Sequence, residues 1–201
     1  MECEIQIEGY HGTTEECAKQ IESSNFKLPQ KPTVDCSDDK KKTYYEYWLG
    51  PGVYMFRDKR AAQWWSTHPC RTYGSVGIPA VMECSIELTS KSVDLTLVEG
   101  IELLHKEYEN FIKMIRNAKG KITIKSNKYK DMNAQAVLRS SFFRWFQQRN
   151  GIDVLIANFI PENMPYVPDE YRRSILDLGL VYNETQYCIY DVRVIKSKAV
   201  L

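Results

Sequence analysis

Strand-like segments run from one end of this chain to the other, so the fold must contain a sheet. Alternation of apolar and polar residues predicts the first strand, and short apolar runs predict the strands that follow it. Aromatic and β-branched residues predict the last strand. The predicted strands are residues 4–10, 53–56, 80–88, 153–158 and 186–195.

Helical segments lie between these strands without a regular alternation of strand and helix. The first helix is expected to begin at a cap formed by Thr13 or Thr14 and to end near Ser23, and the second to begin at Asp58. Apolar residues at helical spacing predict three later helices, at 97–117, 132–148 and 170–178. This order predicts the α+β class, and neither GxGxxG nor GxxxxGK[ST] occurs to support a Rossmann domain or a P-loop.

Composition narrows the class of protein further. The 201 residues are 43% hydrophobic and 26% charged, which is the balance of an ordinary soluble protein, and we expect a single domain over 1–201. No run of 18 apolar residues occurs, and the acidic start lacks the features of a signal peptide, so we expect a cytoplasmic protein. The six cysteines form no CxxC pair and the three histidines lie far apart, so we expect free thiols and no metal site.

Positive charge is concentrated in one segment. Residues 101–150 hold 11 Lys and Arg against 4 Asp and Glu, whereas the rest of the chain is net acidic. This distribution favours a negatively charged partner, although a solvated helical face explains it equally well. Phe142, Phe143 and Trp145 lie in the segment, where exposed rings would stack on unpaired bases; packing in the core is the commoner outcome for such a helix.

Three short segments hold residues that could take part in binding or catalysis. Residues 10–14 (YHGTT) place a histidine at the end of a strand with a glycine directly after it. Residues 47–54 (YWLGPGVY) join a tight turn to a strand tyrosine, and residues 186–191 (QYCIYD) lie near the end of the chain. Each segment alone is explained as well by a structural role, as a hydrogen-bonded histidine, a turn or a core strand.

Together, and in this order, the three segments resemble the catalytic domain of ADP-ribosyltransferases of the diphtheria-toxin and poly(ADP-ribose) polymerase type. In that family a His-Gly-[Ser/Thr] strand is followed by a G-x-G-[Ile/Val]-Tyr strand, a helix and a late strand with the third active-site residue. Here these are His11-Gly12-Thr13, Gly50 to Tyr54, and the strand that begins at Gln186. The resemblance implies a split β-sandwich of two small antiparallel sheets flanked by helices, with 97–150 as a basic helical insertion.

The resemblance also assigns roles in binding NAD and in breaking its nicotinamide–ribose bond. Backbone groups of Gly12 would hold the carboxamide, and the rings of Tyr54 and Trp65 would lie on either side of nicotinamide. A hydrogen bond from the nicotinamide ribose would go to Gln186. The expected catalytic residues are therefore His11, Tyr54 and Gln186, and the expected NAD-binding residues are Gly12, Thr13, Tyr47 and Trp65, with His11 and Thr13 at the adenosine ribose and Tyr47 at the pocket edge.

Two departures from the family pattern affect this expectation. Many members have glutamate where this chain has Gln186, and a serine stands where this chain has Ala62. Glu184 lies two residues before Gln186, on the same face of a strand, and is the alternative third residue. An amide cannot act as a base toward an incoming ribose hydroxyl, so we expect single ADP-ribose units and no polymer.

The expected function is thus mono-ADP-ribosylation of a macromolecule, with NAD as co-substrate and no metal. The basic segment favours a nucleic-acid acceptor, with a protein acceptor second. By resemblance, such compact members act as intracellular toxins or defence effectors that a partner protein, such as an antitoxin, holds in check. Three alternatives stay open: an NAD glycohydrolase, an inactive module that binds NAD or ADP-ribose, and a basic adaptor in which His11 and Tyr54 are structural.

Overall fold

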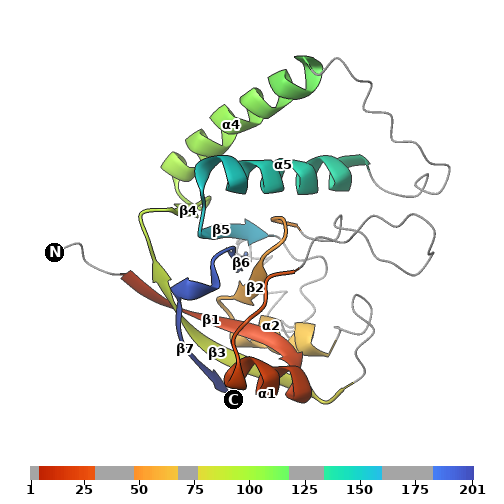
Figure 1. Ribbon diagram of the computed structural model, residues 1–201, viewed down its shortest axis with the longest axis vertical. Helices are drawn as coiled ribbons and strands as arrows, with labels where there is room; N and C mark the ends of the chain where they lie inside the picture. Colours follow the sequence, from red (N-terminus) through yellow and green to blue (C-terminus); the bar gives the residue numbers. More distant parts are fainter. Residues whose placement is uncertain (1–4, 30–47, 68–76, 118–133, 160–182) are drawn as a thin grey trace, which may run out of the picture.

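The computed structural model describes residues 5–29, 48–67, 77–117, 134–159 and 183–201, and it places seven strands and four α-helices there (Figure 1). The α+β class predicted from the sequence is confirmed. The strands are β1 (Ile5–Thr14), β2 (Val53–Phe56), β3 (Pro79–Leu88), β4 (Ser92–Asp94), β5 (Val154–Phe159), β6 (Glu184–Ile189) and β7 (Ile195–Val200). The helices are α1 (Glu15–Ser23), α2 (Lys59–Ser66), α4 (Val98–Asn117) and α5 (Ala134–Asn150).

Hydrogen bonds join the seven strands into one sheet in the order β4-β5-β6-β2-β1-β3-β7. Every neighbouring pair is antiparallel except β4 and β5. The sequence predicted two separate small sheets, and the structure differs because one residue pair, Tyr10↔Phe56, connects β1 to β2. The joint is narrow because β2 has only four residues, whereas β1 pairs with β3 along all ten of its own.

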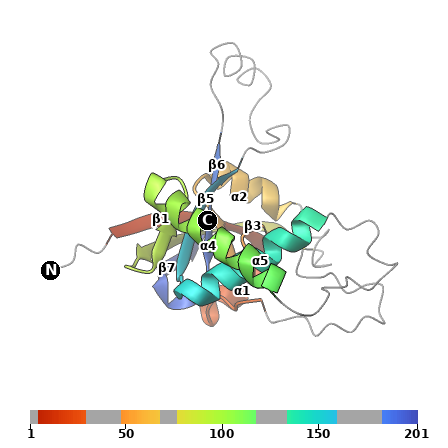
Figure 2. The ribbon, with the colours of Figure 1, turned by 90° about the horizontal axis from the view of Figure 1, so that it is seen from above.

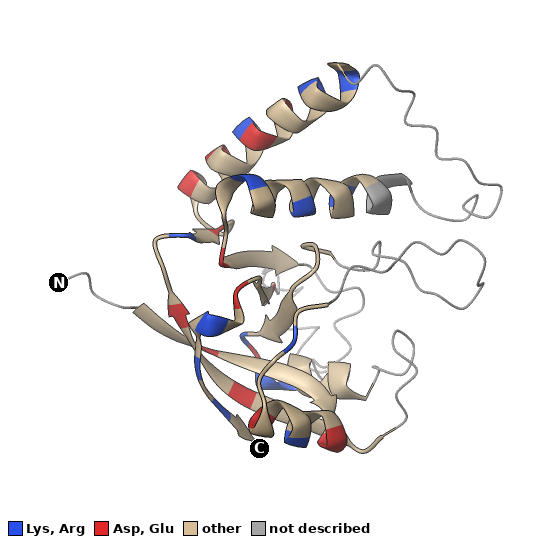
Figure 3. Cartoon of the chain, in the orientation of Figure 1, with Lys and Arg blue, Asp and Glu red and all other residues tan. Residues whose placement is uncertain are grey.

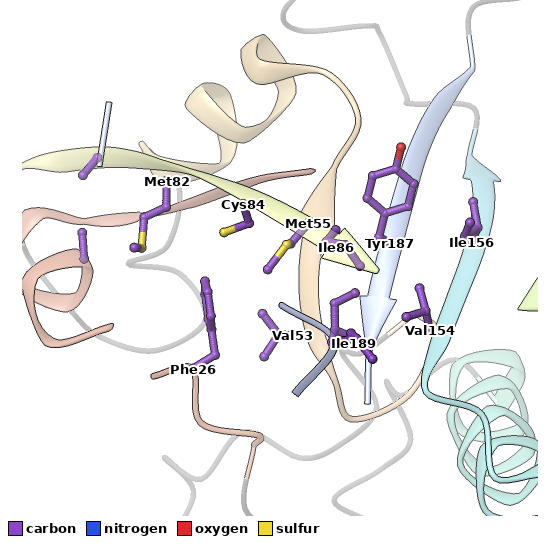
Figure 4. Close-up of a cluster of buried hydrophobic side chains, with 13 residues drawn as sticks. Phe26, Val53, Met55, Met82, Cys84, Ile86, Val154, Ile156, Tyr187 and Ile189 are labelled. Carbon is purple, nitrogen blue, oxygen red and sulfur yellow. The ribbon is translucent and has the colours of Figure 1, made fainter. Parts of the chain in front are cut away.

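The main core lies between the two halves of this sheet. Apolar side chains of β1 and β3 meet those of β2, β5 and β6 there, together with Phe26 from beyond α1 (Figure 4). We call this side of the sheet the inner face. Along β2, Val53 and Met55 point to the inner face, while Tyr54 and Phe56 pack on the opposite side, the outer face.

Helices α4 and α5 cover the outer face of β5 and β6, and both views place them on the same side of the sheet (Figures 1 and 2). Phe142 and Phe146 of α5 and Phe111 of α4 are buried in this second cluster. The described part of the basic segment therefore shares a core with the sheet. Phe142 is not available for base stacking, and Phe143 and Trp145 are half-buried against the same cluster.

A charged pair links the two helices inside this layer. The carboxylate of Glu107 on α4 is buried, and its Oε2 lies 2.7 Å from Nε of Arg149 on α5. Other Arg residues lie along α5, and Lys and Arg residues also lie near the far end of α4 (Figure 3). Because Arg149 is half exposed, the pair is worth less than a fully buried one.

Removing the cation of this pair is expected to destabilise the protein. Arg149→Ala leaves the buried Glu107 carboxylate without its cation, so the free energy of unfolding should fall by about 1–2 kcal/mol. Lys19→Ala is the control, because Lys19 and Glu15 form an exposed pair at 4.0 Å whose loss should cost less than about 0.5 kcal/mol. Urea unfolding at pH 7 compares them, and equal losses would contradict the expectation.

Local signals predicted most element ends correctly. The side chain of Thr14 caps α1 by accepting a hydrogen bond from Cys17 N, and Asp58 caps α2 through Arg60 N. The predicted strand 186–195 is wrong as a single strand. Asp191 accepts hydrogen bonds from the backbone and side chain of Arg193, which starts a 3-10 turn at Val192–Val194 and separates β6 from β7. The helix predicted at 170–178 lies outside the described residues.

Candidate functional site

The sheet brings the three predicted segments onto adjacent strands. His11 lies on β1, Tyr54 on β2 and Gln186 on β6, and β2 is the strand between the other two. Tyr54 pairs with Cys188, and Phe56 pairs with both Gln186 and Tyr10. Residues more than 170 positions apart thus meet within the width of three strands.

His11 bridges β1 and β2 at the point where their pairing stops. Its Nδ1 lies 2.8 Å from the carbonyl oxygen of Tyr54, so a side chain replaces the backbone hydrogen bond that a longer ladder would supply. The imidazole edge also meets the ring of Phe26, with centroids 5.2 Å apart at 89°. His11 is therefore directed to the inner face, beside the main core.

This arrangement fixes which ring nitrogen of the imidazole carries a proton. A carbonyl oxygen only accepts hydrogen bonds, so Nδ1 must carry the proton and the neutral ring then presents Nε2 as an acceptor. Burial lowers the pKa of His11 because desolvation penalises the charged ring, and the bond to Tyr54 offsets this only in part. At neutral pH the side chain can accept a hydrogen bond from a hydroxyl donor.

The lowered pKa predicts a loss of stability in acid. Below pH 6.5, the unfolded histidine binds a proton that the folded one resists, so the free energy of unfolding falls as the pH drops. Above pH 6.5, both states are neutral at this residue and its contribution is constant. Urea unfolding at pH 5.5 and 7.5 should show a smaller pH effect in His11→Asn than in the wild type; the same effect in both would refute the assignment.

Tyr54 is held by the turn that precedes its strand. Its hydroxyl accepts a hydrogen bond from Leu49 N at 2.7 Å and donates one to Gly50 O at 2.9 Å. The Tyr190 hydroxyl donates to Leu49 O, and Cys188 packs against the same turn. These contacts fix the ring on the outer face.

Two positions in this turn require glycine, each for a different structural reason. Gly50 has φ of 90°, which L side chains rarely adopt. A Cβ on Gly52 would lie 2.5 Å from Sγ of Cys188 and 2.8 Å from the oxygen of Ile189, so any side chain would push β2 away from β6. The motif that suggested a family pattern thus also has a local structural explanation.

Gly12 is the point where β1 touches helix α2. A Cβ there would lie 2.1 Å from the carbonyl oxygen of Ala62 and 2.9 Å from Ser66 N. Ala62 itself is fully buried, which leaves no space for the serine of the family pattern without rearrangement. The close approach places α2, and with it Trp65, over the outer face beside β1 and β2.

Trp65 lies near the expected place but with a different neighbour. Its ring stacks on Phe56 at 6.0 Å and 18° and meets Trp64 edge to face. Phe56 shares the outer face with Tyr54, two residues away. Trp65 is 40% exposed, so one side of the ring remains open to a ligand.

Gln186 and Glu184 form a buried pair on the outer face of β6. The Gln186 amide nitrogen donates a hydrogen bond to Oε1 of Glu184, and both residues are buried. The sequence treated these residues as alternatives for a single role. The structure places both on one face, as the spacing predicted, and connects them directly.

The outer face therefore gathers four of the predicted residues, Gly12, Tyr54, Trp65 and Gln186, whereas the imidazole of His11 projects to the inner face. We expected the imidazole of His11 and the phenol of Tyr54 to face one slot for NAD. The structure instead places the two rings on opposite faces of the sheet, and His11 contacts Tyr54 through the Tyr54 carbonyl oxygen. Thr13 continues β1 opposite Ala80 and is half-buried. Tyr47 lies outside the described residues.

Sequence reasoning missed two contributors. Phe26 contacts His11 from the segment after α1, and Phe56 stacks on Trp65. The position of Phe56 could have been predicted from the sequence, because it follows Tyr54 by two residues in a strand and must lie on the same face. The position of Phe26 could not, since its contact depends on how the chain returns after α1.

Comparison with known proteins adds no further assignment: no protein-family model, curated protein or solved structure matches the chain. Within the described ranges, no three His, Cys, Asp or Glu side chains gather as metal ligands would. No helix there is long and apolar enough to cross a membrane. Among the cysteines described, Cys17, Cys84 and Cys188 are free thiols, and burial raises the pKa of Cys84 and of Cys188 to about 12.

Proposed function

We propose that the protein is a mono-ADP-ribosyltransferase that cleaves NAD and transfers ADP-ribose to a macromolecule. The observation that carries the proposal is the strand order β6-β2-β1, which places the strands that carry His11, Tyr54 and Gln186 side by side although these residues lie far apart in the sequence. A purely structural origin of the three motifs would not require them to meet. The strands form one sheet, but its two halves join at a single residue pair, and this narrow joint supports a fold related to the split β-sandwich that the function implies.

The outer face has the groups that a flat cationic ring and a ribose need. Trp65 is 40% exposed and lies on the helix that contacts Gly12, and the buried amide of Gln186 lies on the strand next to Phe56. His11 in its neutral form presents Nε2 as an acceptor for a ribose hydroxyl at the strand joint. Aromatic stacking would contribute about 0.5–1.5 kcal/mol beyond burial.

Cleavage of the nicotinamide–ribose bond requires no general acid. The bond between nicotinamide and C1′ of the ribose breaks, its electron pair goes to the ring nitrogen, and nicotinamide leaves neutral. The acceptor forms the new bond to C1′ and loses a proton. The protein must therefore orient NAD and stabilise positive charge on the ribose in the transition state. The buried carboxyl group of Glu184 lies one hydrogen bond behind Gln186.

The acceptor class rests on charge. Arg139 and Arg144 lie on α5, and the guanidinium of Arg139 sits 4.7 Å from the exposed ring of Trp48. A phosphate backbone suits such a surface, so a nucleic acid remains our first choice and a protein the second. Phe142 is buried, whereas Trp48 is exposed and is an aromatic ring on which a base could stack.

The test is to supply NAD labelled in its adenosine part to the protein, alone and with total cell lysate. Transfer predicts nicotinamide release together with label in nuclease-sensitive or protease-sensitive material, as single ADP-ribose units by mass spectrometry. Release in buffer alone with no labelled macromolecule would identify a glycohydrolase. Saturable NAD binding without release would identify a binding module, and absence of both would reject the proposal.

A further inference from the structure

We infer that Glu184 is a positioning residue that fixes the amide of Gln186 with its carbonyl oxygen toward the ribose of NAD. This inference rests on the proposed function and adds a residue pair to it. It explains why a chain with glutamine at the third position need not be inactive. The pair, rather than either residue alone, replaces the family's glutamate.

The geometry of the pair determines the direction of the amide. Both side chains are buried, at 4% exposure for Glu184 and 8% for Gln186, and the amide nitrogen donates to the carboxylate. The nitrogen and the oxygen of an amide lie on different sides of its carbon, so the oxygen points away from the group to which the nitrogen donates. The carbonyl oxygen of Gln186 is therefore the atom directed away from Glu184.

The hydrogen bond also changes the charge distribution of the amide. Across the sheet the two residues pair with Phe56, Ala157 and Phe159. A hydrogen bond to a carboxylate polarises an amide and increases the negative charge on its oxygen.

For the reaction, this means that the neutral Gln186 amide can still stabilise positive charge. The amide oxygen would accept a hydrogen bond from the 2′-hydroxyl of the nicotinamide ribose. As positive charge develops on that ribose, the polarised oxygen stabilises it through this hydroxyl. Loss of Glu184 should therefore lower kcat more than it raises KM.

The first experiment replaces Glu184, which holds the Gln186 amide. Glu184→Gln keeps size and hydrogen bonding but allows the two amides to pair in either direction, so kcat for nicotinamide release should fall at least tenfold with KM changed less than threefold. Thr185→Val, between the pair and on the opposite face, is the control and should retain wild-type kcat. Full activity of Glu184→Gln would overturn the inference.

The second experiment changes Gln186 alone and then exchanges the two residues of the pair. Gln186→Glu puts two carboxylates side by side, which can share one proton in acid but repel when both ionise, so its activity should fall as the pH rises between about 5 and 8. The exchange variant, Glu184→Gln with Gln186→Glu, restores one amide and one carboxylate and should lose this pH dependence. Gln186→Glu exceeding the wild type at every pH would contradict the pair.

A spectroscopic readout separates this inference from the proposed function. With ¹⁵N-glutamine labelling, the side-chain amide protons of Gln186 should be protected from exchange with water and shifted downfield, and Glu184→Gln should abolish both. Unchanged signals would refute the pair whatever the activity. If the wild type releases no nicotinamide, the proposed function fails while this measurement still decides the pair.

Discussion

Replacing Gly12 with alanine is expected to lower the free energy of unfolding by about 3 kcal/mol and to abolish NAD turnover in the fraction that folds. The added Cβ would lie 2.1 Å from the carbonyl oxygen of Ala62, far inside van der Waals contact. That oxygen belongs to the backbone of α2 and cannot rotate away as a side chain could. The helix must shift as a unit, and Trp65 shifts with it.

The cause is steric, and this distinguishes Gly12 from the glycines that are needed for a positive φ. Gly50 and Gly151 are the described glycines with positive φ, and Gly12 is not among them. An alanine at Gly12 therefore meets no backbone strain of its own, and it gains slightly by restricting the unfolded chain. The loss measures the contact with α2.

Gly77→Ala is the matched control for this prediction. Its Cβ would lie 3.0 Å from side-chain atoms of Thr14 and meets no backbone atom at a shorter distance. We expect a loss below about 1 kcal/mol, since the side chain can adjust. Thermal unfolding and nicotinamide release compare the two variants, and a Gly12→Ala protein as stable as the control would show that α2 is not held where the structure places it.

Local chemistry made much of the fold predictable. The strand 53–56 was predicted with its observed bounds, because glycines precede it and the Asp58 cap follows it closely. Thr14 and Asp58 likewise marked the starts of α1 and α2. The last strand was predicted wrongly, because Arg193 N donates a hydrogen bond to the Asp191 carboxylate and this turn interrupts a segment whose aromatic and β-branched residues otherwise favour a strand.

The site was predictable as a set of residues but not as a geometry. Alternation along β6 placed Glu184 and Gln186 on one face, and that interpretation is confirmed. The pairing of Tyr10 with Phe56 is a long-range choice that no local pattern specifies, and it decides which face each side chain of β1 shares with β2. The imidazole and the phenol therefore took opposite faces where one slot was expected.

The second large effect concerns His11, whose two ring nitrogens can be tested separately. Asparagine places an amide nitrogen near the position of Nδ1, so His11→Asn can still donate to the Tyr54 carbonyl. It has no atom in the place of Nε2. We expect its free energy of unfolding at pH 7.5 to lie within about 1 kcal/mol of the wild type, while kcat/KM for nicotinamide release falls about 10–100-fold.

His11→Ala separates this effect from simple damage to the strand joint. It removes the bond to Tyr54 and the edge contact with Phe26, so it should lose about 1–2 kcal/mol of stability as well as the activity. If His11→Asn keeps both stability and activity, the histidine serves the joint alone and has no role toward NAD. If both variants lose activity while only alanine loses stability, then Nε2 acts on the substrate, because it is the one group that asparagine cannot replace.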